Sequence, residues 1–208
     1  MKFKNVIFDW SGVIKDCFDA HVWSVGEMMK IFGGSAISKE ELKEEWKQPY
    51  MNFWNKYFPN LTLQEEQRVY HEVLLQKDCP KSYSYPGIVD VIKRLKAQGV
   101  FLAIVSSDSP KTLLPEIEEY HLENIFDEII TNVPDKADGV NKILTENDLN
   151  KEETIFIGDS NHEIEVGKLF GIKTLGVTWG FCPEERLKAL NPDYLARNIN
   201  ELENILLS

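Results

Sequence analysis

Short apolar runs alternate with segments of helical periodicity along most of this chain. The strand candidates lie at residues 6–8, 100–105, 128–131, 154–158 and 174–177. Apolar positions three and four residues apart predict helices at residues 88–98, 113–120, 140–147, 160–170 and 184–190. Strands covered by helices on both faces are apolar along their whole length. The pattern therefore predicts an α/β fold with a doubly wound parallel sheet and right-handed crossovers.

The segment between the first strand and residue 86 has a different pattern, with helical periodicity and no strand candidate. One helix is predicted to end at Gly33-Gly34, Ser38 and Glu41 form a capping-box pattern, and Thr62 is a predicted N-cap. Its aromatic residues suit the core of a small bundle. We therefore expect an α/β core of residues 1–15 and 86–208, with residues 16–85 inserted as a helical domain over the sheet's carboxyl edge.

The composition of the chain limits the kinds of partner that it is expected to bind. The chain has 208 residues, of which 43% are hydrophobic, and its formal net charge is -11. This charge disfavours binding to nucleic acid or to an anionic membrane. We expect a cytoplasmic protein, because no apolar stretch reaches the roughly 20 residues that span a bilayer and the N-terminus carries no signal-peptide pattern. The three cysteines show no metal-ligand spacing and suit reduced, structural thiols.

Polar residues of different chemistry follow the three most apolar strands. Asp9 follows the first, Ser106 the second and Asp159 the third. The carboxyl ends of parallel strands meet at one edge of a sheet, which is where ligands bind in such folds. Lys136 is predicted in a loop, and Glu163 comes four residues after Asp159, near the first turn of the next helix. We expect these side chains to converge at that edge.

This set has the parts that phosphoryl transfer requires. Asp9, Asp159 and Glu163 offer the hard oxygen ligands that Mg²⁺ prefers. Asp9 is also a candidate nucleophile, because a carboxylate can form an acyl phosphate. Ser106 can hydrogen-bond a phosphoryl oxygen, and Lys136 can neutralise developing charge. The sequence therefore predicts a magnesium-assisted phosphoryl-transfer site.

These motifs resemble those of the haloacid dehalogenase-like hydrolase superfamily. The matching residues are Asp9-Trp-Ser-Gly-Val13, Ser106, Lys136, Gly158-Asp-Ser-Asn-His-Glu163, Gly171-Ile and Gly176-Val. The resemblance implies that Asp9 is the nucleophile and that Ser106 and Lys136 hold the phosphoryl group. It also implies that Asp9, Asp159, Glu163 and the backbone carbonyl of Ser11 serve Mg²⁺, and that the helical insertion is a cap. Ser107 and Trp10 are the remaining predicted substrate contacts.

Ser11 departs from the family pattern. Phosphatases of this family place a second aspartate two residues after the nucleophile, where it protonates the leaving oxygen and later activates water. Ser11 occupies this position. A serine hydroxyl is a poor acid or base near neutral pH. General acid–base catalysis at this position contributes about 10²–10⁴-fold to the rate, and this is the contribution that the serine puts in question. We assign Ser11 to the catalytic set with its contribution open.

The leading hypothesis is a Mg²⁺-dependent hydrolase of a small phosphorylated metabolite, similar to phosphoglycolate phosphatases, that forms an aspartyl-phosphate at Asp9. Two alternatives stay open. Phe8-Asp-Trp-Ser-Gly12 resembles the first motif of phosphonoacetaldehyde hydrolases, for which Lys47 is the candidate Schiff-base lysine. The other alternative is a catalytically weakened protein that binds a phosphorylated ligand through Ser106 and Lys136. We expect a monomer or a homodimer.

Overall fold

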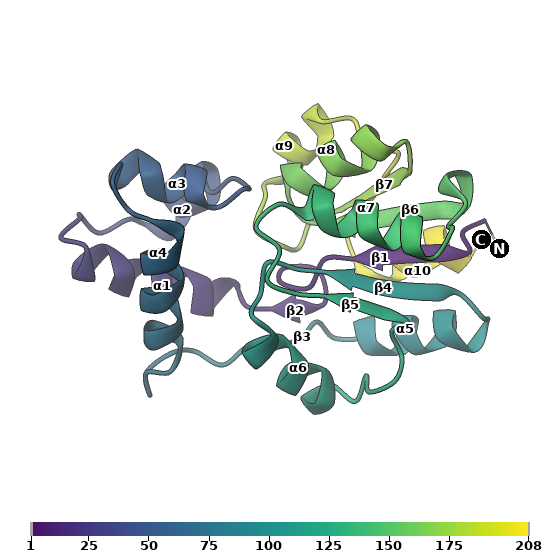
Figure 1. Cartoon of the computed structure of the whole chain (residues 1–208), viewed down its shortest axis with the longest axis horizontal. Coiled ribbons are helices and arrows are strands. Elements are labelled where there is room, and N and C mark those ends of the chain that lie inside the picture. The colour runs from purple at the N-terminus through teal and green to yellow at the C-terminus, as the bar shows by residue number, and fades with distance from the viewer. Residues whose placement is uncertain (1, 208) are drawn as a thin grey trace. The chain divides into compact units, whose positions relative to one another are not determined.

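The computed structural model describes residues 2–207, and the larger of its two sheets has six parallel strands (Figure 1). The strand order is β5-β4-β1-β6-β7-β8. The strands are β1 (Asn5–Phe8), β4 (Phe101–Val105), β5 (Glu128–Ile130), β6 (Thr154–Gly158), β7 (Lys173–Val177) and β8 (Tyr194–Ala196). Strands are added outward from β1 on both sides, through β4 to β5 in one direction and through β6 and β7 to β8 in the other. This order confirms the predicted doubly wound α/β fold.

The register of the central strands places the three polar endings side by side. β1 pairs in parallel with β4 and β6, and Phe8 lies opposite both Ile104 and Ile157. The backbone N–H of Asp9 then donates to the Ile157 carbonyl at 2.9 Å. Asp9 therefore leaves the sheet between the ends of its two neighbouring strands.

Helices cover both faces of the sheet (Figure 1). Val6 and Phe8 of β1 are buried with side chains of the helices α5 (Ile88–Ala97), α6 (Pro110–Glu119) and α10 (Ile199–Leu207). Ile7 is buried on the opposite face with side chains of α7 (Lys136–Glu146) and α8 (Asn161–Phe170). Each residue of β1 is buried, as the continuous apolar run predicted. Among the described residues, no helix combines the length and hydropathy needed to cross a bilayer.

The chain divides into two compact units. The core unit comprises Met1–Asp16 and Tyr83–Ser208, and the helical unit comprises Cys17–Ser82. The helical unit contains α1 (Phe18–Ile31), α2 (Lys39–Glu45), α3 (Met51–Tyr57) and α4 (Leu63–Leu74). They enclose an apolar cluster of their own, which includes Met28, Met29, Leu42, Phe53, Trp54 and Val69. The predicted bundle core is confirmed, because aromatic and aliphatic side chains share it.

The predicted helix caps are present in the helical unit. The Ser38 side chain accepts the N–H of Glu41, while the Glu41 carboxylate accepts the N–H of Ser38, which completes the capping box. The Thr62 hydroxyl accepts the N–H of Glu65 at 3.2 Å. Both sets of contacts satisfy amide groups that have no partner within the first turn of a helix.

Four elements differ from the sequence expectation. Lys15–Asp16 (β2) and Tyr83–Ser84 (β3) pair as a short antiparallel ribbon, although no strand was expected in 16–85. Strands of two residues are too short to show a period. β8 and α10 follow residue 190, where no element was expected, and β8 is an edge strand in which Ala196 is the buried residue. A single buried position carries no recognisable alternation.

Glu66 makes the stability of the helical unit pH-dependent. Its side chain lies on α4 and is 4% exposed, and burial raises its pKa to about 7. The unfolded chain therefore loses this proton near pH 4.5, while the folded chain keeps it up to about pH 7. Stability contributed by the protonated carboxyl is complete below pH 4.5 and is lost as the pH rises to 7, by about 3 kcal/mol.

Glu66→Gln removes this dependence. We expect it to match the wild type near pH 4.5 and to exceed it by about 3 kcal/mol at pH 8, in urea unfolding at both pH values. Glu65→Gln changes the exposed neighbouring carboxylate and should keep the wild-type pH profile. Parallel pH profiles for the wild type and Glu66→Gln would contradict the assignment.

Candidate active site

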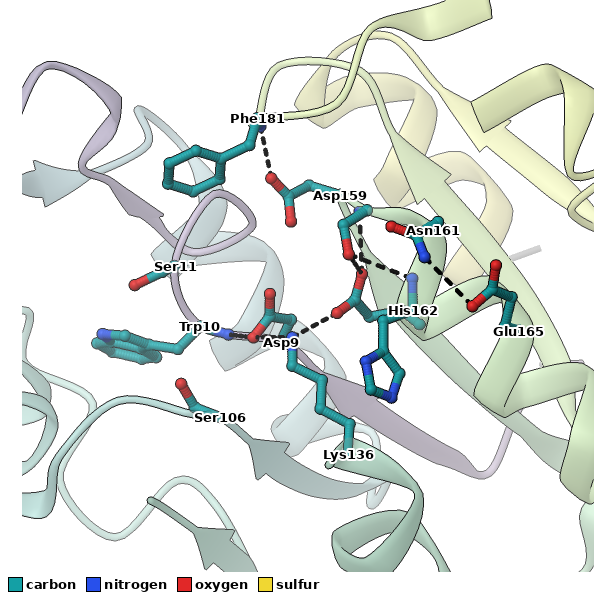
Figure 2. Close-up of polar contacts among 12 residues, drawn as sticks. Asp9, Trp10, Ser11, Ser106, Lys136, Asp159, Asn161, His162, Glu165 and Phe181 are labelled. Atoms are coloured by element: carbon teal, nitrogen blue, oxygen red, sulfur yellow. Dashed lines mark hydrogen bonds and ion pairs between the residues drawn. The ribbon is translucent and has the colours of Figure 1, made fainter. Parts of the chain in front are cut away.

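Asp9 begins the site, at the carboxyl end of β1 (Figure 2). Its side chain is buried, and its Oδ1 accepts the N–H of Trp10 at 2.7 Å. The chain then turns through Gly12, whose φ of +84° suits glycine. A Cβ at Gly12 would lie 2.2 Å from Asp159 Oδ2. The glycine predicted from sequence therefore supplies both backbone freedom and room for a second carboxylate.

Lys136 joins two carboxylates. Its Nζ lies 2.8 Å from Asp9 Oδ1, and it also donates to Glu163 Oε1. The lysine is 4% exposed. The predicted loop position is wrong: Lys136 is the first residue of α7, whose N-cap is Asp135. The Asp135 side chain accepts the N–H of Ala137 at 2.9 Å, so the helix starts earlier than the apolar periodicity indicates.

Backbone and side-chain donors hold the other two carboxylates: Asp159, which directly follows β6 (Figure 2), and Glu163, in the first turn of α8. Glu163 Oε2 accepts the N–H of Ser160 at 2.9 Å and its hydroxyl at 2.7 Å, as part of a capping box. Asp159 Oδ2 accepts the N–H of Phe181 at 2.5 Å. Both carboxylates are at most 2% exposed. Their orientations are thus set before any ligand binds.

His162 lies between these residues in sequence and is buried. A histidine on a first helical turn is more often at the surface, but the His162 side chain is buried. The ring Nε2 lies 2.9 Å from Asp135 Oδ1. This contact links the first turn of α8 to the N-cap of α7, the two helices that carry Glu163 and Lys136.

The charges of the site are unbalanced. Burial raises the pKa of Asp9 to about 7, although Lys136 opposes this shift, and burial raises the pKa of Asp159 well above its usual range. Burial would also raise the pKa of Glu163, but the charge and hydrogen bond of Lys136, together with the hydrogen bond from Ser160, outweigh burial and lower that pKa. The Lys136 pKa is raised, because Asp9 and Glu163 together outweigh the effect of burial. One buried cation thus faces three buried carboxylates.

The same carboxylates fit a hard divalent cation. Ligand oxygens of Asp9, Asp159 and Glu163 lie within 4.8 Å of one another. Asp9 Oδ1 and Asp159 Oδ2 already accept protein N–H groups, and both oxygens of Glu163 are engaged by Lys136 and Ser160. The second oxygens of Asp9 and Asp159 are therefore the carboxylate atoms that remain for Mg²⁺, and the metal role predicted for Glu163 stays a prediction. The raised pKa values of the two aspartates fit this assignment, because a bound cation would balance their charge.

Ser106 and Ser11 lie to one side of Asp9 in Figure 2, with Asp159 and Lys136 on the other. Ser106 directly follows β4 and is buried; its N–H donates to the Ile130 carbonyl at 2.9 Å. Ser107 follows and is half-buried. The Ser11 hydroxyl donates to Asp108 Oδ2 at 2.6 Å. The predicted set is thus brought to one edge, and the phosphoryl-binding roles and the metal role of the Ser11 carbonyl stay predictions.

Trp10 does not fit its expected role as a substrate contact. Its side chain is 0% exposed, and its indole N–H donates to Glu116 Oε2 at 2.8 Å. The indole also stacks on Tyr120, with ring centroids 5.6 Å apart. The other oxygen of Glu116 lies 2.6 Å from Lys15 Nζ. In this structure Trp10 anchors the loop after β1 to α6, because its apolar surface is covered by the core.

Gly158 is required by the position of Glu163. A Cβ at Gly158 would lie 2.1 Å from Glu163 Cγ. We expect Gly158→Ala to destabilise the protein by about 1–3 kcal/mol, the usual range for overpacking, and to lower kcat because a displaced Glu163 would weaken its contact with Lys136. Urea unfolding and steady-state kinetics measure both effects.

Gly26→Ala is the matched control. Gly26 lies inside α1 with open space around an added Cβ, so alanine should stabilise that helix by up to about 1 kcal/mol. A Gly158→Ala variant with wild-type stability and kcat would show that Glu163 tolerates displacement.

This chain is similar to known proteins over most of its length. A family described as haloacid dehalogenase-like hydrolase matches residues 6–177. The chain is 24% identical to a protein named pyrophosphatase PpaX from Halalkalibacterium halodurans, over 99% of this chain and 98% of the relative. It is 22% identical to a phosphoglycolate phosphatase from Synechococcus elongatus, over 95% of this chain and 94% of the relative.

Solved structures share the fold. The crystal structure described as a predicted phosphatase from Clostridium acetobutylicum aligns with a TM-score of 0.85 and 21% identity, covering 100% of this chain and 99% of that one. A structure described as a predicted phosphoglycolate phosphatase from Haemophilus somnus aligns with a TM-score of 0.80 and 20% identity, covering 99% and 98%.

Proposed function

Because this chain belongs to the haloacid dehalogenase-like hydrolase family, we propose that it hydrolyses a small phosphorylated metabolite through an aspartyl-phosphate at Asp9, with Mg²⁺. The observation that carries the proposal is the buried ion pair between Asp9 and Lys136, at 2.8 Å, at the end of the central strand. A nucleophilic carboxylate beside a cation, at the ligand-binding edge of a parallel sheet, suits attack on a phosphoryl group.

In the first half-reaction a carboxylate oxygen of Asp9 attacks phosphorus, and the bond from phosphorus to the leaving oxygen breaks. Lys136 stabilises the charge on the phosphoryl oxygens, while Glu163 and Asp9 hold its ammonium group in place. Ser106 supplies a hydroxyl to the same oxygens. A bound Mg²⁺, held by Asp9 and Asp159, would screen the charge of nucleophile and phosphoryl group. The product is an acyl phosphate on Asp9.

In the second half-reaction water attacks phosphorus, and the bond between phosphorus and Asp9 breaks. Burial protects the acyl phosphate from random solvent, since Asp9 is 5% exposed. The attacking water needs a base, and Ser11 occupies the position where related phosphatases carry an aspartate. Phosphoryl transfer depends mainly on positioning and charge stabilisation, so we expect turnover without that aspartate.

The relatives guide the choice of substrates. Those named pyrophosphatase and phosphoglycolate phosphatase motivate inorganic pyrophosphate and 2-phosphoglycolate as first candidates. The test is phosphate release from these compounds, from p-nitrophenyl phosphate and from a panel of sugar phosphates, with Mg²⁺ or with EDTA. We expect Mg²⁺-dependent release. Phosphate binding without release by the wild type would favour the weakened phospho-ligand-binding protein instead.

The phosphonatase alternative has no specific support in the structure. Lys47 lies between α2 and α3 and is exposed. A lysine that forms a Schiff base is activated by desolvation in an apolar pocket or by a neighbouring cation, and an exposed side chain between two short helices lacks such a pocket. Borohydride trapping with phosphonoacetaldehyde tests this branch, and we expect no adduct at Lys47.

Metal binding has a readout independent of activity. Mg²⁺ at 10–100 times its Kd should stabilise the wild type by about 1–3 kcal/mol, because the ion binds the folded site only. Asp159→Asn should abolish this increase in thermal stability. Asp138→Asn, which neutralises an exposed carboxylate on α7, should retain it. An equal effect of Mg²⁺ on wild type and Asp159→Asn would place the ion elsewhere.

A further inference from the structure

We propose that Asp108 acts through the Ser11 hydroxyl as the base for hydrolysis of the acyl phosphate, in place of the aspartate that Ser11 replaces. The proposal rests on the proposed function. Its central observation is the hydrogen bond from Ser11 Oγ to Asp108 Oδ2 at 2.6 Å. This bond joins the loop after β1 to the loop after β4, and β1 and β4 are adjacent strands of the sheet.

Asp108 is fixed in the loop by its own backbone. Its N–H donates to Ser106 Oγ at 3.1 Å, and its carbonyl accepts the N–H of Asn132 at 2.8 Å. These contacts leave the carboxylate to Ser11. An aspartate that only shaped this turn would direct its carboxylate to neighbouring N–H groups of the same turn. The Asp108 carboxylate is instead directed to the loop after β1, where it accepts the Ser11 hydroxyl.

The loop after β1 has other anchors. Glu116 accepts the indole N–H of Trp10 at 2.8 Å and pairs with Lys15 at 2.6 Å. The carbonyl of Trp10 accepts the N–H groups of Ile14 and Lys15 at 2.9 and 3.0 Å. Ser11 lies between these fixed residues. The charge of Asp108 is thus not needed to hold the loop, and a chemical role for it can be tested separately from the fold.

The exposure of the Ser11 and Asp108 side chains also suits a proton relay. Ser11 and Asp108 are half-buried, whereas Asp9, Lys136, Asp159 and Glu163 are buried. Water can therefore reach the Ser11–Asp108 pair. Ser11 lies beside Asp9 in Figure 2. The pair lies beside the nucleophile on a side open to water.

The proposed proton path balances. As the water oxygen bonds to phosphorus, the bond from phosphorus to Asp9 breaks. One water proton passes to Ser11 Oγ, and the hydroxyl proton of Ser11 passes to Asp108 Oδ2. When the next substrate molecule reacts with Asp9, the same proton returns through Ser11 to the oxygen of the leaving group. Ser11 is then the catalytic contact, and Asp108 is the positioning residue that polarises it.

Transient kinetics with p-nitrophenyl phosphate separate the two half-reactions. This leaving group needs little protonation, so the first step does not depend on the relay. We expect Asp108→Asn to retain the rate of the p-nitrophenol burst and to slow the second step by about 10²-fold. Phosphorylated enzyme should accumulate, and the apparent KM should fall with kcat. The asparagine keeps an acceptor for Ser11 and cannot take its proton.

Two further variants test the path through Ser11. Ser11→Ala should slow the second step as much as Asp108→Asn, and the double variant should be no slower, because the pair acts as a unit. Ser11→Asp should restore the second step in the Asp108→Asn background, since it places a carboxylate where Ser11 now stands. Asp90→Asn, an exposed carboxylate on α5, is the charge-matched control and should behave as the wild type.

The outcomes are distinguishable. Equal slowing of burst and second step in Asp108→Asn would assign Asp108 a structural role and overturn the relay. Wild-type rates for both steps would overturn it as well, while leaving the proposed function intact. A wild type without burst or turnover on any phosphate ester would overturn the proposed function together with the relay.

Discussion

Asp9→Asn is expected to lower kcat by about 10⁴-fold or more, as loss of a catalytic nucleophile does in other enzymes. The amide is a far weaker nucleophile than the carboxylate, and no acyl phosphate can form. The fold should survive, because burial disfavours the charge on Asp9 and Lys136 keeps its bond to Glu163. Steady-state kinetics and thermal unfolding measure the two effects together.

Asp16→Asn is the control for Asp9→Asn. Asp16 is an exposed carboxylate on β2, seven positions after Asp9 in the sequence. It should keep wild-type kcat. If Asp9→Asn retained more than a few per cent of the activity, after its integrity had been checked by mass spectrometry, Asp9 would not be the nucleophile.

Lys136→Met is expected to impair both stability and turnover. Removing the ammonium leaves Asp9 and Glu163 buried without the cation that lies between them, and loss of one partner of a buried ion pair costs about 3–5 kcal/mol. The phosphoryl oxygens also lose a charge that stabilises the transition state. We expect kcat to fall by about 10²–10³-fold.

A second substitution separates the two effects of Lys136→Met. Lys136→Met with Glu163→Gln removes one unpaired carboxylate, so it should regain part of the stability and none of the activity. Lys142→Met, on the same helix, removes an exposed lysine 3.8 Å from Glu146 and should be near neutral. Wild-type stability for Lys136→Met would contradict the electrostatic account of the site.

The sequence predicted the sheet and its functional edge because β1, β4 and β6 are covered on both faces. Their continuous apolar runs locate the strands, and the first polar residue after each run is then Asp9, Ser106 or Asp159. Parallel packing brings those residues together without further information. The family resemblance rested on the same positions.

Other features depend on contacts between distant segments. Lys136 follows Asp135 in a polar stretch of sequence, and its burial comes from Asp9 and Glu163, which lie far away along the chain. Trp10 follows the nucleophile, but a partner on α6 draws it into the core. Sequence periodicity contains no information about either partner.

Asp108 shows the same limit within the proposed mechanism. An aspartate just after a strand is commonly a turn residue, so the sequence does not single out Asp108, and Ser11 departs from the family pattern with no compensating residue visible in the sequence. The bond between the two side chains becomes visible once β1 and β4 are paired. The structure thereby identifies Ser11 and Asp108 as the two residues whose substitution tests how the missing aspartate is replaced.

The most direct test of the account is to trap the acyl phosphate. The wild type is mixed with Mg²⁺ and p-nitrophenyl phosphate, quenched in acid during the burst, digested and analysed by mass spectrometry. We expect a hydroxylamine-labile phosphoryl group on Asp9 of the wild type. It should be absent from Asp9→Asn and enriched in Asp108→Asn. Turnover with no phosphoryl group on Asp9 in any variant would contradict it.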